Sequence, residues 1–283
     1  METRYFKQVS LSCLLCLLTL SAGCVFNMAG GGMPAKYERT IHLSAALPAG
    51  STFAAQTHNG SITIKGADVA DCNLTATIVG RAATDEDARE LAEKTQVTLE
   101  PSDNKLVVKI DKPTVRMNQS VSVSLDAGVP NKTNLELVTH NGAVEIAHIA
   151  GRVDATTHNG NVTTEAVSGT TVLKTHNGSV HCTEISGNAQ LSTHNGSVKA
   201  YYAPAAPSVC DISIVTSNGS IEFAAPAGLS AQVEATTHNG SVHTDVPITV
   251  VGKVSKNELK GTIGAGQGGK LRLKTHNGSI RIR

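Results

Sequence analysis

The stretch Thr139-His140-Asn141-Gly142-Ala143-Val144 opens a unit that returns in nearly the same form along the rest of the chain. The tetrapeptide Thr-His-Asn-Gly occurs seven times, and Thr216-Ser217-Asn218-Gly219 is an eighth copy. The first three spacings after His140 are 18 residues each. Self-similarity at a fixed period is typical of a repeat architecture. The histidines of these THNG units are His58, His140, His158, His176, His194, His238 and His276.

Apolar residues alternate with polar ones on both sides of each Asn-Gly pair. Val144 and Val162 stand two residues after the glycine, and a second glycine, such as Gly151 or Gly169, comes seven residues later. Alternation with a period of two predicts half-buried strands. Each unit is therefore expected to hold two short strands, joined by an Asn-Gly corner and separated from the next unit by a Gly corner. The repeat-structural residues predicted at the Asn-Gly corners are Asn141, Gly142, Asn159, Gly160, Asn177, Gly178, Asn195, Gly196, Asn218, Gly219, Asn239, Gly240, Asn277 and Gly278.

Two all-β folds fit this pattern. Asn-Gly between alternating strands is a strong hairpin signal, which would give an up-and-down meander. In a β-solenoid, by contrast, each unit is one coil stacked on the next, so that Thr lies over Thr and Asn over Asn at about 4.8 Å. The solenoid explains why the same residue type returns at the same position, and it is the preferred prediction. Alternation then predicts that Thr and Asn point inward and that His points to solvent.

The long gap between the first and second THNG units has a different character. Thr84 precedes three acidic residues and the helix formers of residues 88–94, which predicts a short capped helix. Strand-like runs at residues 72–79, 105–110 and 121–125 flank it, so this excursion is expected to cap or broaden the N-terminal end of the solenoid. The predicted organisation is a signal peptide at 1–23, a lipidated cysteine and tether at 24–39, an N-terminal β region at 40–138 and THNG repeats at 139–283, with 40–283 one continuous domain.

The N-terminus has the layout of a bacterial export signal. Arg4 and Lys7 precede an apolar run at residues 11–20, which is too short to span a bilayer. Residues 20–24, Leu-Ser-Ala-Gly-Cys, resemble a lipobox, although the leucine lies four residues before Cys24 rather than the usual three. The resemblance implies cleavage before Cys24 and lipidation of that residue. The expected location is the bacterial cell envelope, with the membrane as partner through the lipid anchor, and the outer membrane as the favoured site, facing either the periplasm or the surface.

Composition excludes several classes of function. The 283 residues carry 24 basic and 23 acidic side chains, and only 3% are aromatic. A nucleic-acid binder would show a basic stripe and stacking rings, so no nucleic acid is expected as partner. Cys72, Cys182 and Cys210 have no metal-like spacing and are interpreted as small buried apolar residues, with Cys182 and Cys210 the nearest candidates for a disulfide.

The chain resembles a bacterial family of β-strand-repeat proteins that is named for a suspected role in adhesion. The shared motif is Thr-x-Asn-Gly, a small or acidic residue, and then Val or Ile, as in Thr175-His176-Asn177-Gly178-Ser179-Val180. The C-terminal stretch from Gly268 to Ile282 also matches, and the resemblance covers roughly residues 40–283. It implies a β-solenoid-like envelope protein without catalytic residues. This chain differs in that x is nearly always His and the residue after Gly is mostly Ser.

The histidines are the candidate functional residues. Stacked coils would place them in an outward column, where neighbouring imidazoles could share zinc or copper. His181 and His243 add a second imidazole to two units. The sequence contains no nucleophile-elbow motif (G-x-S-x-G), no zinc-protease motif and no phosphate-binding loop, so neither an enzyme nor a cofactor is expected. The predicted function is adhesion or scaffolding through a repeated polar face that binds a surface glycan or protein, with metal sequestration as the alternative. The candidate metal ligands are His140, His158, His176, His194, His238 and His276.

Overall fold

The structure is a computed structural model that describes residues 33–251, 255–266 and 268–283. The predicted signal peptide, Cys24 and the first part of the expected tether lie outside the described residues. Within the described part of the chain, no helix is both long enough and apolar enough to cross a membrane.

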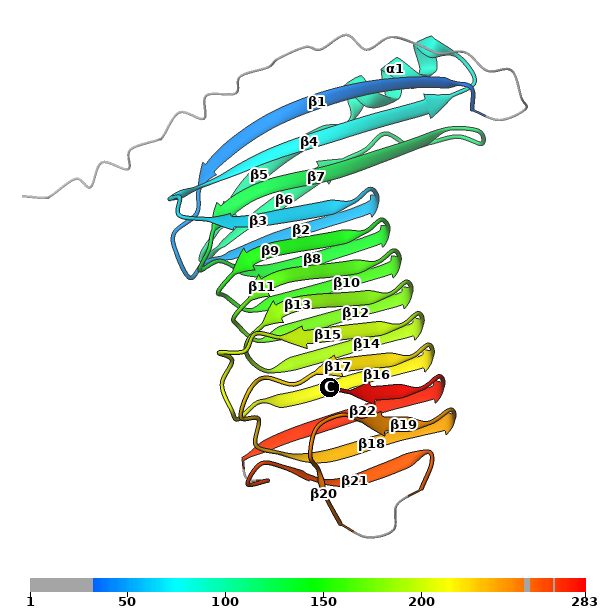
Figure 1. Ribbon diagram of the computed structural model, residues 1–283. Coiled ribbons are helices and arrows are strands. Elements are labelled where there is room, and N and C mark those ends of the chain that lie inside the picture. Colours follow the sequence, from blue (N-terminus) through cyan, green and yellow to red (C-terminus); the bar gives the residue numbers. More distant parts are fainter. Residues whose placement is uncertain (1–32, 252–254, 267) are drawn as a thin grey trace, which may run out of the picture.

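The described residues form 23 strands and one helix (Figure 1). The N-terminal end contains β1 (Ala35–Ala46), β2 (Thr52–Asn59), β3 (Ile62–Ala67), β4 (Asp71–Ala82), α1 (Asp85–Lys94), β5 (Gln96–Ser102), β6 (Lys105–Asp111) and β7 (Ser120–Pro130). The middle of the chain contains β8 (Asn134–Asn141), β9 (Val144–Ile149), β10 (Val153–Asn159), β11 (Val162–Val167), β12 (Thr171–Asn177), β13 (Val180–Ile185), β14 (Ala189–Asn195), β15 (Val198–Tyr202), β16 (Asp211–Asn218) and β17 (Ile221–Ala224). The C-terminal end contains β18 (Ala231–Asn239), β19 (Val242–Thr244), β20 (Thr249–Val250), β21 (Glu258–Ile263), β22 (Gly269–Asn277) and β23 (Ile280–Ile282).

Each THNG unit is one coil of a β-solenoid. The strand before the Asn-Gly corner lies in a 12-stranded sheet, and the strand after it lies in an 11-stranded sheet. Equivalent strands of neighbouring coils pair in parallel, so that Asn141, Asn159 and Asn177 are in register. The two strands of one unit do not pair with each other in either sheet. The solenoid prediction is therefore confirmed and the meander is excluded.

The core lies between the two sheets and consists mainly of small aliphatic side chains. The residue two positions after the glycine is fully buried in the middle coils, as at Val144, Val162 and Val180. Leu137, Ala155 and their equivalents face these residues from the other sheet. Narrow coils leave little room for large rings, which explains why so few aromatic residues suffice. Phe53 and Phe223 are the largest fully buried side chains among the described residues.

The N-terminal end replaces parallel coils by antiparallel strands and a helix. β4 pairs antiparallel with both β1 and β7, and β7 then joins the first coil through a parallel pairing with β3. The predicted helix is confirmed: the Thr84 side chain accepts a hydrogen bond from the Asp87 amide as its N-cap. Ala88, Leu91 and Ala92 are buried where α1 packs against β4 and β1. This end therefore covers the open face of the first coil, as expected.

The expected tether at 24–39 needs a correction. β1 begins at Ala35, because residues 35–46 pair with β4 over their whole length. Ala35 and Ile41 are buried in this pairing. Residues 35–39 therefore belong to the folded domain.

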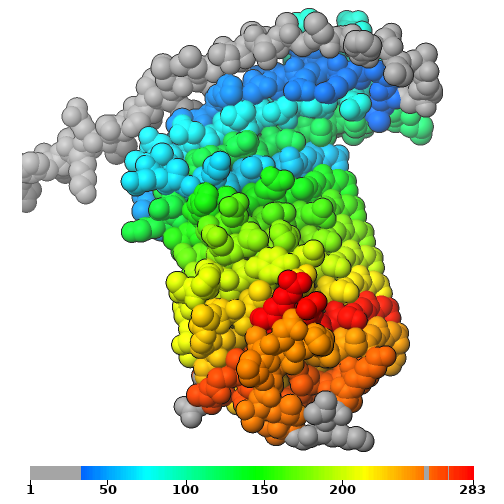
Figure 2. Space-filling view, viewed as in Figure 1, coloured from blue at the N-terminus to red at the C-terminus, as the bar shows by residue number. Residues whose placement is uncertain are grey.

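The C-terminal end departs from the order of the sequence. β22 lies between β16 and β18, so the last THNG unit is inserted between the two units that precede it (Figure 1). In Figure 2 the red C-terminal atoms accordingly lie between yellow and orange segments. β20 and β21 form an antiparallel pair, and β21 adds to the free side of β18. The long gap before the last unit thus supplies an end cap.

The three cysteines of the described chain are free and buried, which confirms their interpretation as small apolar residues. Burial raises the pKa of both the Cys72 and the Cys182 thiol to about 12. No disulfide joins Cys182 to Cys210.

The repeated polar face and its groove as a candidate functional site

The threonine and the glycine of each THNG unit hold neighbouring coils together. Thr157 is buried, and its Oγ1 donates a hydrogen bond of 2.9 Å to the Gly142 carbonyl of the preceding coil. A Cβ added to Gly160 would lie 2.0 Å from the same Gly142 oxygen, so only glycine fits this corner. The same threonine-to-glycine bond is made by Thr139, Thr175, Thr193, Thr216, Thr237 and Thr275.

The asparagines form a continuous ladder, but on the outside. The Asn159 Nδ2 donates to the Asn141 Oδ1 at 2.8 Å, and the Asn177 Nδ2 donates to the Asn159 Oδ1 at the same distance. The expectation that they point inward is wrong. The chain bends at this corner, so His158 and Asn159 are both exposed although they are consecutive. The ladder continues through Asn59, Asn195, Asn218, Asn277 and Asn239.

The histidines form an exposed column of stacked rings along the corner edge of the 12-stranded sheet. His58, His140, His158, His176 and His194 stack with ring centroids 4.7–4.9 Å apart and with planes within 7° of parallel. This spacing matches the distance between hydrogen-bonded strands, so the backbone sets it. Ser217 follows in the next coil and ends the run. His276 and His238 stack beyond it as a separate pair, with centroids 4.7 Å apart.

The stacked geometry bears directly on metal binding. The lone pair of an imidazole nitrogen lies in the plane of its ring, so parallel rings direct their lone pairs side by side rather than at one ion. Within the described residues, no group of three or more His, Cys, Asp or Glu side chains is arranged to hold a metal. Metal binding by the column stays a prediction, and it would require the rings to turn out of the stack. A zinc titration of the full chain, compared with a variant carrying His158→Ser, His176→Ser and His194→Ser, tests it.

The two additional histidines lie away from the column. His181 and His243 belong to β13 and β19 of the 11-stranded sheet, across the Asn-Gly corner from the stacked rings. The His181 ring packs edge-on against Tyr201, and His243 contacts Asp245 at 2.9 Å. They therefore contribute no second imidazole to the column.

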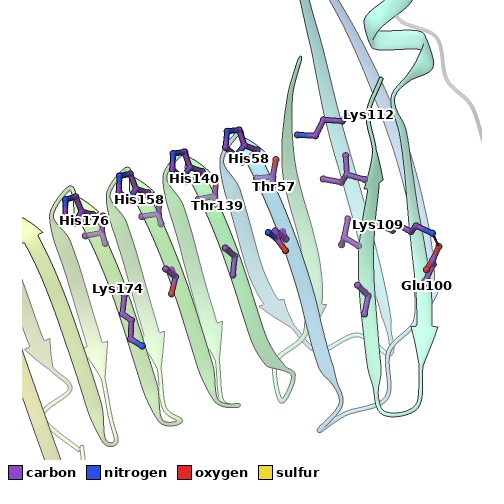
Figure 3. A pocket seen from close by; sticks show the side chains of 18 residues that line it. Thr57, His58, Glu100, Lys109, Lys112, Thr139, His140, His158, Lys174 and His176 are labelled. Carbon is purple, nitrogen blue, oxygen red and sulfur yellow. Dashed lines mark ion pairs between the residues drawn. The ribbon is translucent and has the colours of Figure 1, made fainter. Parts of the chain in front are cut away.

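A groove lies beside the N-terminal part of the column (Figure 3). β6 pairs with β2 only as far as Ala55 and Val108. Beyond these residues a groove of about 780 Å³ runs between β6 and the outer face of β2, β8, β10 and β12. Its lining includes four of the stacked histidines together with Glu100, Lys109, Lys112, Val138, Thr156 and Lys174. This volume lies within the range of about 300–1,000 Å³ that is common for ligand sites.

The charges in the groove are only partly compensated. Glu100 lies 3.2 Å from Lys109 and, together with Asp111, raises the pKa of that ammonium group. Lys112 and Lys174 have no carboxylate partner within ion-pair distance among the described residues. Partial burial lowers the pKa of Lys112. In Figure 3 its side chain extends from just beyond the end of β6 toward the side of the groove on which His58 and Thr57 lie.

Sequence reasoning found the column and missed the groove. The histidines repeat with the THNG units, whereas Lys109 and Lys112 lie in the nonrepetitive gap and meet the column only through the pairing of β6 with β2. No local motif in the sequence marks this pairing.

The family profile described as Toastrack DUF4097 matches residues 46–283, which is most of the chain. The chain belongs to the Toastrack DUF4097 family. The resemblance indicated by the THNG units is thereby confirmed at the level of the family. No curated protein matches this Toastrack chain.

Several crystal structures resemble this Toastrack protein along nearly their whole length. A "putative cell adhesion protein" from Clostridium sporogenes is 10% identical, with a TM-score of 0.34 over 86% of this chain and 99% of that one. A "putative adhesin" from Bacteroides fragilis is 13% identical, with a TM-score of 0.40 over 87% and 97%. A "putative lipid binding protein" from Parabacteroides distasonis is 12% identical, with a TM-score of 0.43 over 89% and 98%. At these identities and scores, nothing about the ligands of this chain follows from the likeness.

Proposed function

We propose that this Toastrack protein is a non-enzymatic binding protein of the bacterial cell envelope, acting in adhesion or as a surface scaffold. It holds a surface glycan or protein on the outer face of the 12-stranded sheet. The stacked histidine column is the observation that supports this role. Five identical exposed side chains at a constant spacing of 4.7–4.9 Å form a rigid, extended recognition surface.

The arrangement of polar groups favours binding over catalysis. A catalytic site brings different groups together, such as a nucleophile, a base and a group that orients it. The column instead presents the same group side by side in every coil. The three cysteines of the described chain are buried thiols whose raised pKa values disfavour the reactive thiolate.

A rigid surface loses little conformational freedom when a ligand binds. The Thr-to-Gly bonds and the Asn ladder hold each corner from both sides, so the imidazoles are ordered before contact. Less ordering is then required on binding, which favours affinity.

We propose further that the protein is anchored through lipid on Cys24, in the outer membrane, with the solenoid facing either the periplasm or the surface. Metabolic labelling with a fatty acid analogue, followed by fractionation, tests this location. Wild-type protein should carry label in the membrane fraction, and a Cys24→Ser variant should carry none. Labelling of both proteins, or of neither, contradicts the anchor.

Binding is tested with a variant in which the five column histidines and the separate pair His238 and His276 are changed to serine. Serine is the natural residue at the equivalent position Ser217, so the coils are expected to keep their fold. Purified full chain and variant are screened against immobilised glycans and matrix proteins, and strains that express each are compared for adherence to the same surfaces. Loss of a ligand and of adherence in the variant supports the proposal. Equal binding and adherence, or no binding and no adherence in either, overturns it.

A further inference from the structure

The groove contains two positive charges that the protein itself leaves uncompensated. Its one lining carboxylate, Glu100, is already paired with Lys109. Two acids on the neighbouring strands are also engaged: Glu136 lies 2.7 Å from Lys105, and Asp154 lies 3.8 Å from Arg152. Asp111, which precedes Lys112, is exposed and raises the pKa of Lys109 without an ion pair of its own among the described residues. The ammonium groups of Lys112 and Lys174 are thus available to pair with an anionic ligand.

The position of Lys112 makes an anionic partner favourable. Lys112 directly follows β6, and its side chain points into the groove toward His58 (Figure 3). The residue is exposed, but nearby protein still removes part of the hydration of its ammonium group. An ammonium group that has lost water is stabilised by a nearby negative charge more strongly than one in bulk solvent. Lys174 lies on the far side of the groove, on β12, so the two charges are separated along the ligand path.

The shape of the groove favours a chain over a compact ligand. It crosses β2, β8, β10 and β12, and the column of imidazoles follows its edge at the spacing of the strands. Because the rings stack face to face, they present only their edges, with nitrogen atoms that donate or accept hydrogen bonds. A ligand with polar groups at regular intervals can use several of these edges in succession.

The lining fits sugar rings rather than nucleotide bases. Thr156 offers a hydroxyl group, and Val138, whose side chain is 42% exposed, offers an apolar patch beside it. Phe, Tyr and Trp are absent from the lining residues, and the faces of the internal histidines are covered by their neighbours. Binding of single-stranded nucleic acid depends on such open ring faces.

We propose that the groove binds a linear acidic polysaccharide, with Lys112 and Lys174 pairing with its carboxylates and the imidazole edges contacting its hydroxyl groups. The inference rests on the proposed function, because it names the ligand class for the same polar face. It adds the direction of the ligand, which runs across the strands from β6 toward β12.

The chain supplies a matched control for this proposal. Residues 173–179 and 273–279 have the same sequence, Leu-Lys-Thr-His-Asn-Gly-Ser. Lys174 lines the groove on β12, whereas Lys274 occupies the same position in its coil on β22, three strands farther along the sheet. The two lysines thus share their local sequence and their place in a parallel-paired strand, and Lys274 does not line the groove.

The test is a calorimetric titration of the purified full chain with linear polygalacturonate. The double variant K112Q/K174Q should weaken binding about tenfold, since two exposed charge pairs together contribute about 1.4 kcal/mol. K274Q should bind as the wild type does. Fully methyl-esterified polygalacturonate, which has the same backbone without charge, should likewise bind about tenfold more weakly than polygalacturonate. Thermal unfolding midpoints of both variants should match that of the wild type, since all three lysines are exposed.

Three outcomes overturn the inference. The first is that wild-type protein does not bind polygalacturonate, and the second is that the double variant and K274Q bind it equally. The third is that polyglutamate of equal charge binds as tightly, which would assign the groove to acidic peptides. The proposed function is judged separately by the serine variant of the column. If that variant loses the binding of another ligand, the proposed function is supported and the proposal of an acidic polysaccharide is rejected.

Discussion

The middle coils from β8 to β17 and the N-terminal end from β1 to β7 differ in how their backbone and side-chain polar groups find hydrogen-bond and packing partners. In the middle coils each unit has an equivalent neighbour on both sides, so identical residues can bond to one another, as Asn159 does to Asn141 and Asn177. At the N-terminal end no further coil follows. There the strands turn antiparallel, and α1 packs against β1 and β4.

The comparison explains why some residues repeat along the sequence and others do not. A residue repeats when its partner is a repeated residue one strand away, either its own equivalent, as for Asn159, or the corner glycine, as for Thr157, and repetition ends where that strand is missing. Close contact is the strictest case, because the Gly142, Gly160 and Gly178 corners leave no space for a side chain. Gly128, in β7 of the N-terminal end, has nothing within 4 Å of the position of a Cβ. Glycine is thus indispensable at every corner of the stack and replaceable at Gly128, whereas Gly80 of the N-terminal end is fixed by a different contact, the Ala88 carbonyl of α1, 2.1 Å from the position of its Cβ.

The largest effect is expected from Gly160→Ala. Its Cβ would lie 2.0 Å from the Gly142 carbonyl oxygen, a contact between backbone atoms that only a shift of the coils can relieve. The free energy of unfolding should fall by about 3 kcal/mol or more. Gly128→Ala should change it by less than about 1 kcal/mol. Guanidinium denaturation of both variants measures the difference, and equal effects would remove the basis of the comparison.

A smaller effect is expected from the buried hydroxyl groups. Thr175→Val removes the 2.9 Å bond to the Gly160 carbonyl, and it should destabilise the protein by about 1–3 kcal/mol. Thr133, at the junction of β7 and β8, is buried with a hydroxyl oxygen that has no partner in the described structure. Thr133→Val should therefore be neutral or stabilising in the same denaturation experiment. Destabilisation by both changes would mean that loss of the hydroxyl group is harmful irrespective of its bond.

A substitution near the second corner of the coils is expected to raise the free energy of unfolding. His148, Ala166 and Glu184 stand 18 residues apart and share a left-handed backbone with φ of 52–58°. At the N-terminal end, the non-glycine left-handed residues are Asp103 and Asn118, whose residue types, like His148 and unlike Ala166 and Glu184, adopt this conformation more readily. The stack thus imposes a strained bend on ordinary residues.

Ala166→Gly should relieve this strain and raise the free energy of unfolding by about 0.5–1 kcal/mol, because glycine adopts positive φ freely. Ala147→Gly, in β9, should lower it by about the same amount, because φ is not positive there. Changes of the same sign in the two variants would show that strain at Ala166 is not the cause.

The smallest effect is expected from an exposed ion pair at the C-terminal end of the solenoid. Arg281 contacts Asp245 at 2.9 Å and lowers the pKa of its carboxyl group, with a smaller contribution from His243. A lowered folded-state pKa stabilises the protein above the ordinary carboxyl pKa of about 3.9, and the contribution is lost as the pH falls through the folded value. Asp245→Asn should lower the thermal midpoint slightly at pH 7 and not at pH 2.5. An equal decrease at both pH values would contradict this assignment.

Much of the fold was predictable because the repeated residues contact their own equivalents. The period, the buried valines and the inward threonines follow from one unit, and Thr84 marks the helix start through a local hydrogen bond. The direction of the asparagines was not predictable from alternation, since alternation holds within a strand and the chain bends at Asn159. The histidine column was predictable for the same reason as the coils, whereas the groove beside it was not.

The sequence by itself determined that this protein is a stack of β coils with a histidine at every corner but that of Ser217, because period and alternation are local properties of the chain. Only the tertiary structure decided the order of the last coils and the position of the groove. Every coil presents nearly the same edge, so nothing in a unit specifies its neighbour. The insertion of β22 between β16 and β18 follows from the long connection through β20 and β21. That Lys112 and His58 line one groove likewise depends on where β6 leaves β2, a pairing between segments about fifty residues apart.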